Sequence, residues 1–252
     1  MVFLAKTITL LCVIFISLQH NIILAQDMYI ELLAGLSKPP FVISNKDKGM
    51  QPEIIKAAFA KSDKFVQFTY LPLSRHLDVL HAREFDGIIT LSDSDKEWGI
   101  YLSKPYIVYQ NVVVTLKESA LKIDKLEDLN KLKVTAFQDA TRFLGDKYKS
   151  TFKNSANYTE IADQKSQVNS LFSGQADALI MDISIFKHLL ANARNEKSEN
   201  NNYDKKYVTH FLFNPKAYSA GFKSEQLCQE FDKGINAIIE DGSYQRIIDS
   251  YF

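Results

Sequence analysis

The chain has 252 residues, and its 30 Lys and Arg residues balance its 30 Asp and Glu residues. A balanced charge argues against nucleic acid or an anionic membrane surface as a partner. The length is enough for one large domain or two small ones.

The first 25 residues have the layout of an export signal. Lys6 is followed by the apolar run TITLLCVIFISL, and the small residue Ala25 precedes Gln26. The run is shorter than the roughly 20 residues that cross a bilayer, and no other apolar run of that length follows. We therefore expect a signal peptide over residues 1–25, cleaved near Ala25, and a mature chain that does not span a membrane. Cys228 would then be the only thiol, and its apolar helical surroundings predict a buried packing role.

Strand and helix patterns alternate through the first part of the mature chain. MYIELLAGL is typical of a strand, QPEIIKAAFAKSD of a helix with Pro52 in its first turn, and FVQFTYLP of a second strand. SRHLDVLHARE predicts a helix capped by Ser74, and FDGIITL predicts a third strand. This alternation predicts an α/β fold with a parallel sheet and helices on its faces.

The alternation begins again at KIDKLEDLNKLKVTAFQDATRFLG and continues through SQVNSLFSGQADALIMDISIFKHLL. The segment around Asn195–Asn202 has no apolar periodicity and is typical of an exposed loop. VTHFLFNPKAYSAGF looks extended, and SEQLCQEFDKGINAIIEDG predicts a helix that ends before Gly242. SYQRIIDSYF predicts a last amphipathic turn. Two α/β units in series follow from these patterns.

A series of motifs resembles a known family. SKPPF, the helix start Gly49–Ile55, HAREFDGIIT, YLSKPY, KLEDLNKLKVTAFQDAT, LFSGQADALIMD and INAIIEDGSYQRIIDSYF follow the order and spacing of the periplasmic solute-binding proteins of family three, the polar amino-acid type. The resemblance implies the two-lobed, type II periplasmic binding protein fold. Each lobe would be a mostly parallel sheet flanked by helices, with two crossing segments and a ligand cleft between the lobes. Lobe one would be residues 26–109 and 218–252, and lobe two, with the crossing segments, residues 110–217.

The resemblance also implies a function. It predicts a periplasmic monomer without a cofactor that captures a small polar solute, an amino acid or a related carboxylate, and closes on it for delivery to an ABC importer. A sensor receptor is an alternative membrane partner. An enzyme resembling cyclohexadienyl dehydratase is an alternative function, in which Asp182, Asp139, His76 and Lys96 could supply acid–base chemistry. The chain shows no nucleophile turn, metal-binding helix motif or phosphate loop, which favours a binding protein over an enzyme.

Asp182 is the first candidate ligand residue. A zwitterionic solute needs a fixed anion near its ammonium group, because an unpaired buried charge costs several kcal/mol. Asp182 ends the apolar run DALIMD and matches the family aspartate that accepts the ligand ammonium. The alternative is an N-cap for the helix that begins ISIFKHLL.

The segment after the third predicted strand supplies further candidates. Counting back six residues from Leu102 places Lys96 where the family carries an arginine, although a lysine binds a carboxylate less selectively and could simply face water. Thr90 and Ser92 match the family's hydroxyl segment, and satisfied strand-end hydroxyls are the alternative.

QDATRFLG aligns with the family's Q-G-S-T turn, in which N–H groups and a hydroxyl hold the ligand carboxylate. Asp139 and Ala140 replace the glycine and the serine, Thr141 keeps its hydroxyl, and Arg142 could neutralise Asp139. Arg75, at another predicted helix start, is a further basic candidate.

The aromatic platform of the family is altered. Lys38 and Leu73 stand at positions that are usually aromatic. Trp98, Phe137 and Tyr106 are therefore the candidates for an apolar wall of the site, with a place in the core as the alternative for each.

Overall fold

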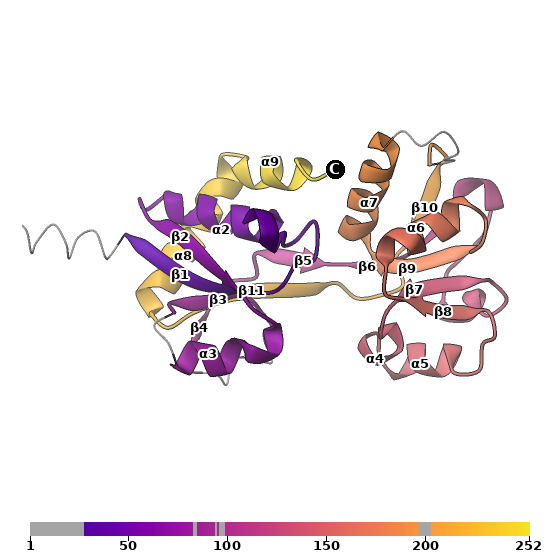
Figure 1. Cartoon of the computed structure of the whole chain (residues 1–252), viewed down its shortest axis with the longest axis horizontal. Helices are drawn as coiled ribbons and strands as arrows, with labels where there is room; N and C mark the ends of the chain where they lie inside the picture. The colour runs from indigo at the N-terminus through magenta and orange to yellow at the C-terminus, as the bar shows by residue number, and fades with distance from the viewer. Residues whose placement is uncertain (1–27, 83–84, 94, 96–98, 197–202) are drawn as a thin grey trace, which may run out of the picture. The chain divides into compact units, whose positions relative to one another are not determined.

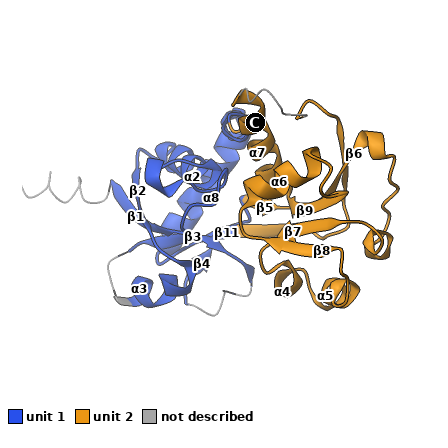
Figure 2. Cartoon of the chain, turned by 45° about the vertical axis from the view of Figure 1, so that its right-hand side comes forward, with its two compact units in different colours: residues 1–106, 219–250 blue, residues 107–218, 251–252 orange. Residues whose placement is uncertain are grey.

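The computed structural model describes residues 28–82, 85–93, 95, 99–196 and 203–252. The chain divides into two compact units (Figure 2): unit 1 runs to Tyr106 and resumes over Ser219–Ser250, and unit 2 comprises Ile107–Tyr218 and Tyr251–Phe252. Each unit contains a sheet flanked by helices (Figure 1), so the predicted α/β class with two sheets is confirmed.

The sheet of unit 1 has the strand order β2-β1-β3-β11-β4. Strand β1 pairs in parallel with β2 and β3, whereas β11 is antiparallel to β3 and β4. The strands are β1 (Tyr29–Ala34), β2 (Phe65–Tyr70), β3 (Gly87–Leu91), β4 (Tyr101–Leu102) and β11 (Lys216–Phe222). The helices and 3-10 turns are η1 (Ser44–Lys46), α2 (Met50–Ala60), η2 (Leu73–Arg75), α3 (His76–Ala82), α8 (Glu225–Glu240) and α9 (Ser243–Asp249). The first half of β11 lies in unit 2, where it pairs with β5 (Ile107–Tyr109).

Helices α2 and α8 pack closely in the core of unit 1. A Cβ atom at Gly234 would lie 2.2 Å from the carbonyl oxygen of Ala58, so this crossing needs a glycine. Phe59, Phe222 and Phe231 surround the crossing with ring centroids 5.4–5.6 Å apart, and none of the three is exposed. These contacts hold the C-terminal end of α2 against α8 and β11.

Cys228 lies on the same face of α8. Its thiol is free and buried, and burial raises the pKa of the thiol to about 11. This burial confirms the predicted packing role of the cysteine. The raised pKa also makes the thiol a poor nucleophile.

The helix predicted to be capped by Ser74 is α3, which begins at His76. Leu73–Arg75 form the 3-10 turn η2, whose N-cap is Pro72 and which has no side-chain cap bond. The fixed φ of Pro72 starts the turn earlier and leaves Ser74 inside it. The prediction that Ser74 caps this helix is therefore wrong.

The sheet of unit 2 has the strand order β10-β6-β9-β7-β8. Strand β7 pairs in parallel with β8 and β9, whereas β6 is antiparallel to β9 and β10. The strands are β6 (Asn111–Leu116), β7 (Val134–Phe137), β8 (Tyr158–Ile161), β9 (Ala178–Asp182) and β10 (Tyr207–His210). The helices and 3-10 turns are η4 (Lys117–Ser119), η5 (Leu126–Leu129), α4 (Ala140–Phe143), α5 (Asp146–Phe152), α6 (Gln164–Phe172) and α7 (Ile183–Asn195).

Helices lie on both faces of the unit 2 sheet (Figure 1). On the face covered by α4 and α5, Tyr148 and Phe152 pack in the core with Ala136 of β7. On the other face, the buried side chain of Gln167 in α6 donates from its amide to the carbonyl oxygens of Thr135 and Ile180, at 2.9 Å each. These bonds connect α6 to β7 and β9 and fix the strands whose ends carry the candidate residues.

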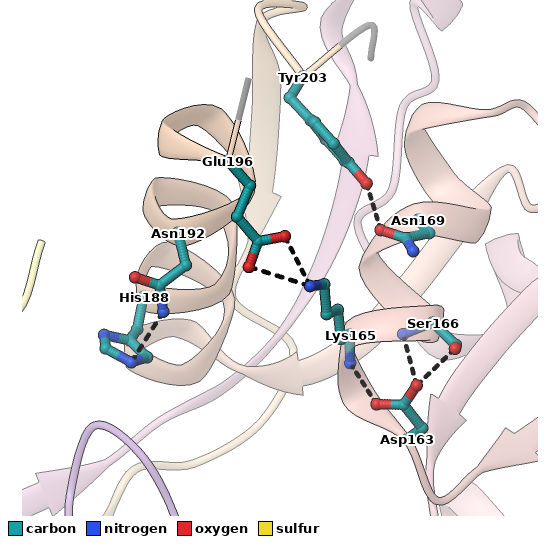
Figure 3. Close-up of polar contacts among 8 residues, drawn as sticks. All are labelled: Asp163, Lys165, Ser166, Asn169, His188, Asn192, Glu196 and Tyr203. Carbon is teal, nitrogen blue, oxygen red and sulfur yellow. Dashed lines mark hydrogen bonds and ion pairs between the residues drawn. The ribbon is translucent and has the colours of Figure 1, made fainter. Parts of the chain in front are cut away.

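Polar side chains connect α6 to α7 and to the chain before β10 (Figure 3). Lys165 Nζ lies 2.7 Å from Glu196 Oε2, and the hydroxyl of Tyr203 donates to the amide oxygen of Asn169. Asp163 caps α6 by accepting from the N–H of Lys165 at 3.1 Å. This layer supports the helices rather than the strand ends.

Within the described residues no helix is both long enough and apolar enough to cross a membrane. The predicted signal peptide, residues 1–25, lies outside the described residues. So does most of the predicted loop, since α7 extends to Asn195 and residues 197–202 are not described.

Candidate functional site

In unit 1, Thr90 lies near the carboxyl end of β3 and is half-buried. Its Oγ1 accepts a hydrogen bond of 2.9 Å from the Nε2 of Gln51, which is fully buried at the start of α2. The same Nε2 donates to the hydroxyl oxygen of Tyr106 at 2.9 Å, and that hydroxyl donates to the carbonyl oxygen of Ile89 at 2.7 Å. A buried network therefore holds Thr90 in place.

Ser92 follows β3 and bonds within its own turn. Its N–H and its hydroxyl donate to Asp95 Oδ2 at 2.7 Å and 2.8 Å. The turn fixes the backbone directly after the strand, and the ligand role of Ser92 stays a prediction. Lys96 and Trp98 lie outside the described residues.

The other unit 1 residues singled out in the sequence for the ligand site are exposed, except Tyr106. Arg75 is exposed at the end of η2, and Leu73 of the same turn is 54% exposed. Lys38 is exposed and forms an antiparallel bridge with Val42. Tyr106 is buried, with its ring 5.5 Å from Phe231 in an edge-on contact, so it belongs to the core rather than to an apolar wall.

In unit 2, the chain turns sharply between β7 and α4. Asp139 adopts a left-handed conformation with φ 62° and ψ 21°, which aspartate tolerates better than most residues and glycine adopts most easily. Helix α4 starts at the next residue, and the N–H of Thr141 donates to Glu160 Oε1 at 2.9 Å. The backbone donor predicted to meet a ligand carboxylate thus meets a carboxylate of the chain itself.

Glu160 of β8 is held from two sides. The hydroxyl of Tyr158 donates to Glu160 Oε1 at 2.9 Å, and the hydroxyl of the buried Tyr148 donates to that of Tyr158 at 3.0 Å. Burial pushes the pKa of Glu160 up, but the hydrogen bonds from Thr141 and Tyr158 outweigh burial and hold this pKa below its usual value. The side chain is therefore a fixed anion.

Arg142 and Phe137 flank this turn. Arg142 is exposed, and its guanidinium carbon lies 5.5 Å from the ring centroid of Phe143. Among the described residues it forms no ion pair with Asp139. Phe137, at the end of β7, is partly buried and packs against the core of unit 2.

Asp182 ends β9 and is 5% exposed. Its Oδ1 accepts from the N–H groups of Ser184 at 2.8 Å and Ile185 at 3.2 Å, and its Oδ2 accepts from the N–H of Gln110 at 2.8 Å. The N-cap interpretation of Asp182 is therefore confirmed. The same bonds fix the carboxylate at the end of the strand.

Three carboxylates mark neighbouring strand ends in unit 2. Asp182 ends β9, Asp139 follows β7, and Glu160 is the penultimate residue of β8. Because these strands are adjacent and parallel, their carboxyl ends meet at one edge of the sheet, where ligands of α/β proteins commonly bind. In the described part of the chain, no group of three or more His, Cys, Asp or Glu side chains is placed to hold a metal ion.

Sequence reasoning missed Gln51 and Glu160. Gln51 stands three, four and seven positions before Ile54, Ile55 and Ala58, so it occupies the buried stripe of its helix. Glu160 stands two positions after Tyr158 and so shares its face of the strand. The sequence shows that each of these polar residues occupies an unusual position, but the threonine that each one binds lies far away in the sequence.

Comparison with solved structures supports the fold. A polar amino acid ABC uptake transporter substrate-binding protein from Streptococcus thermophilus has 18% identity and a TM-score of 0.68, with 90% of this chain and 87% of that chain covered. An amino acid ABC transporter substrate-binding protein from Streptococcus pneumoniae, bound to L-arginine, has 18% identity and a TM-score of 0.56, covering 90% and 95%. An ancestral amino acid-binding protein, described as a precursor of cyclohexadienyl dehydratase, has 18% identity and a TM-score of 0.55, covering 90% and 96%.

At these identities the likeness shows the fold alone. Comparison with curated protein sequences gave no match. The family match is more extensive: residues 32–252 match the bacterial extracellular solute-binding proteins, family 3. This range takes in both units and every candidate residue, and the chain therefore belongs to family 3 of the bacterial extracellular solute-binding proteins.

Proposed function

We propose that this protein is an exported, periplasmic solute-binding protein that captures an amino acid with a positively charged side chain. Groups from both units would contact the solute, and the closed form would deliver it to an ABC importer in the inner membrane. Family membership supports solute binding, and the relative from Streptococcus pneumoniae that was solved with L-arginine supports the choice of solute.

The observation that carries the choice is the row of carboxylates at the strand ends of unit 2. Asp139 lies just after β7, Glu160 is the penultimate residue of β8 and Asp182 is the last residue of β9, and these three strands are adjacent and parallel. Backbone N–H groups bind two of these side chains, and such bonds favour the charged form of a carboxylate. A cationic group of the solute would be favoured at this edge and a second anion disfavoured.

Unit 1 would supply the complementary contact. Thr90 is half-buried and held by Gln51, so its hydroxyl is preorganised for a polar group of the solute. Each charge-assisted contact is worth about 1.5–3 kcal/mol, so a few of them suffice for micromolar binding after the entropy costs. A solute that contacts both units would stabilise the closed form by its higher affinity for that form.

The buried state of His76 favours binding over catalysis. Its side chain is 1% exposed, and Nε2 lies 3.2 Å and 3.0 Å from the carbonyl oxygens of Ala34 and Leu71. Burial lowers the pKa of His76 more than these two contacts raise it. The histidine of the alternative acid–base set is thus a neutral core residue.

A thermal-shift screen of the mature protein tests the proposal. The panel contains L-arginine, L-lysine, L-glutamine, succinate, putrescine and a tripeptide. Ligand at 100 times its Kd stabilises a protein by about 2.7 kcal/mol, which raises the Tm of a chain of this size by roughly 5–10 °C. We expect that rise with L-arginine. A larger rise with succinate, or product formed from any compound, would contradict the proposal.

Asp182→Asn provides the matched variant for calorimetry with L-arginine. The amide oxygen can still cap α7, although the amide nitrogen cannot accept from the N–H of Gln110, so the helix cap is kept while the charge is removed. We expect the affinity for L-arginine to fall at least about tenfold, since a charged contact is replaced by a neutral one. An unchanged affinity would place the solute away from this carboxylate.

A further inference from the structure

Gln51 is a fully buried polar side chain that joins three elements of unit 1. It lies at the start of α2, and its Nε2 is 2.9 Å from both Thr90 Oγ1 in β3 and the hydroxyl oxygen of Tyr106, which follows β4. Buried polar groups are costly unless they are hydrogen-bonded, so we expect each of these contacts to have one donor and one acceptor.

The contact between Tyr106 and Ile89 sets that direction. The hydroxyl oxygen of Tyr106 lies 2.7 Å from the carbonyl oxygen of Ile89, and two oxygens this close need a proton between them. A carbonyl has no proton to give, so Tyr106 donates and its only hydroxyl proton is used. Its oxygen can then only accept from Gln51, which places the NH₂ group of Gln51, and not its oxygen, toward both hydroxyls.

The orientation of this amide fixes the role of Thr90. The two protons of Gln51 Nε2 are given to Tyr106 and to Thr90, so Thr90 Oγ1 is an acceptor toward Gln51. The hydroxyl proton of Thr90 is then left to donate in another direction. Thr90 is half-buried, so this proton can reach a solute.

We propose that Gln51 is a positioning residue that commits the Thr90 hydroxyl to donate to an oxygen of the solute. The group recognised is a hydrogen-bond acceptor, a carboxylate in the amino acids of the proposed function. The inference rests on that function, because it concerns how the same solute is held. It makes Gln51 a determinant of specificity without direct contact with the solute.

Gln51→Glu reverses the network with almost no change in shape. Tyr106 keeps its proton for Ile89, so a protonated carboxyl at the position of Nε2 would donate its one proton to Tyr106, and the same oxygen would face Thr90 as an acceptor. An ionised carboxylate has no proton, so Tyr106 would donate to it instead of to Ile89, and the carboxylate would again face Thr90 as an acceptor. In both states Thr90 donates its proton to the Glu side chain and can no longer donate it to the solute.

Calorimetry with L-arginine and with agmatine, which lacks the carboxylate, tests this role on the mature protein. We expect Gln51→Glu to weaken L-arginine binding at least about tenfold while agmatine binding changes less than about twofold. Thr90→Val should show the same loss, Thr90→Ser should bind like wild type, and the double variant Gln51→Glu, Thr90→Val should lose no more than Thr90→Val alone.

The outcomes separate this inference from the proposed function. If wild type does not bind L-arginine, the proposed function fails and the inference fails with it. If wild type binds it but Gln51→Glu binds equally well, or loses agmatine to the same extent, only the inference fails. Should Gln51→Glu not fold, Tyr106→Phe replaces it: the hydroxyl that sets the direction of the amide is removed, and the preference for L-arginine over agmatine should fall. An unchanged preference would overturn the inference.

Discussion

The strand ends of the two units use their hydrogen-bond donors in opposite ways. In unit 1 the amide of Gln51 donates to Thr90 and leaves the threonine proton to donate outward. In unit 2 the N–H groups at the starts of α4 and α7 are bound by Glu160 and Asp182. Similar α/β scaffolds therefore present a hydrogen-bond donor in one unit and negative charge in the other. The amino acid with a cationic side chain that we propose as the solute would have groups that match both.

Removing the Asp182 side chain should have the largest effect on unit 2. Asp182→Ala leaves the N–H groups of Ser184, Ile185 and Gln110 without this acceptor, and two of them belong to the first turn of α7. A lost N-cap costs about 1 kcal/mol, and a buried donor left unbonded adds a similar amount. We expect the free energy of unfolding in urea to fall by about 2–3 kcal/mol.

Asp182→Asn is the control for this prediction, because its amide oxygen can still accept at the cap. Its stability should lie between those of wild type and Asp182→Ala. Equal stability of the alanine variant and wild type would show that these bonds do not hold the edge of unit 2, and the contrast between the units would then lose its structural basis.

Glu160→Gln should have a smaller effect that depends on pH. The hydrogen bonds hold the native pKa of Glu160 below its unfolded value, so this group stabilises the fold above the unfolded pKa of about 4.3 and loses that contribution as the pH falls through the native pKa. We expect the variant to be about 1 kcal/mol less stable at pH 7, a value reduced for partial exposure. Urea unfolding between pH 7 and pH 3 measures the difference, which should shrink as the pH falls.

Tyr158→Phe separates the carboxylate from its support. It removes the donor to Glu160 but keeps the charge and the bond to Thr141. The pH dependence should persist with a smaller amplitude. If the difference in stability between Glu160→Gln and wild type does not change with pH, then Glu160 does not bind this turn as an anion.

Local patterns were enough to predict most elements of the fold. The apolar stripe after Gly49 predicted α2, alternation predicted β1 and β2, and Phe231, Ile235 and Ile238 marked the buried face of α8. The antiparallel neighbours were not predicted, because pairings such as β6 with β9 join segments distant in the sequence. A local pattern indicates a strand but carries little information about its partner.

The candidate site was less predictable for the same reason. The N-cap role of Asp182 was foreseen as an alternative to its ligand role, because an acid directly before an apolar helix is a local pattern. Gln51 and Glu160 were missed because each acts on a residue in another element, Thr90 in one unit and Thr141 in the other. A polar residue on an apolar stripe indicates that a partner exists, and only the fold shows which residue it is.

Variants in the outer helices of unit 2 should have the smallest effect. They test whether the charge contrast between the units depends only on the strand ends. Glu196→Gln removes the ion pair with Lys165 that joins α7 to α6 (Figure 3). Both side chains are exposed, so solvent screens the pair, and we expect neither the urea midpoint nor the affinity for L-arginine to change measurably. Lys165→Met should behave alike. A changed affinity in either variant would mean that binding depends on the outer helices as well as on the strand ends, and the charge contrast could no longer be assigned to Glu160 and Asp182 alone.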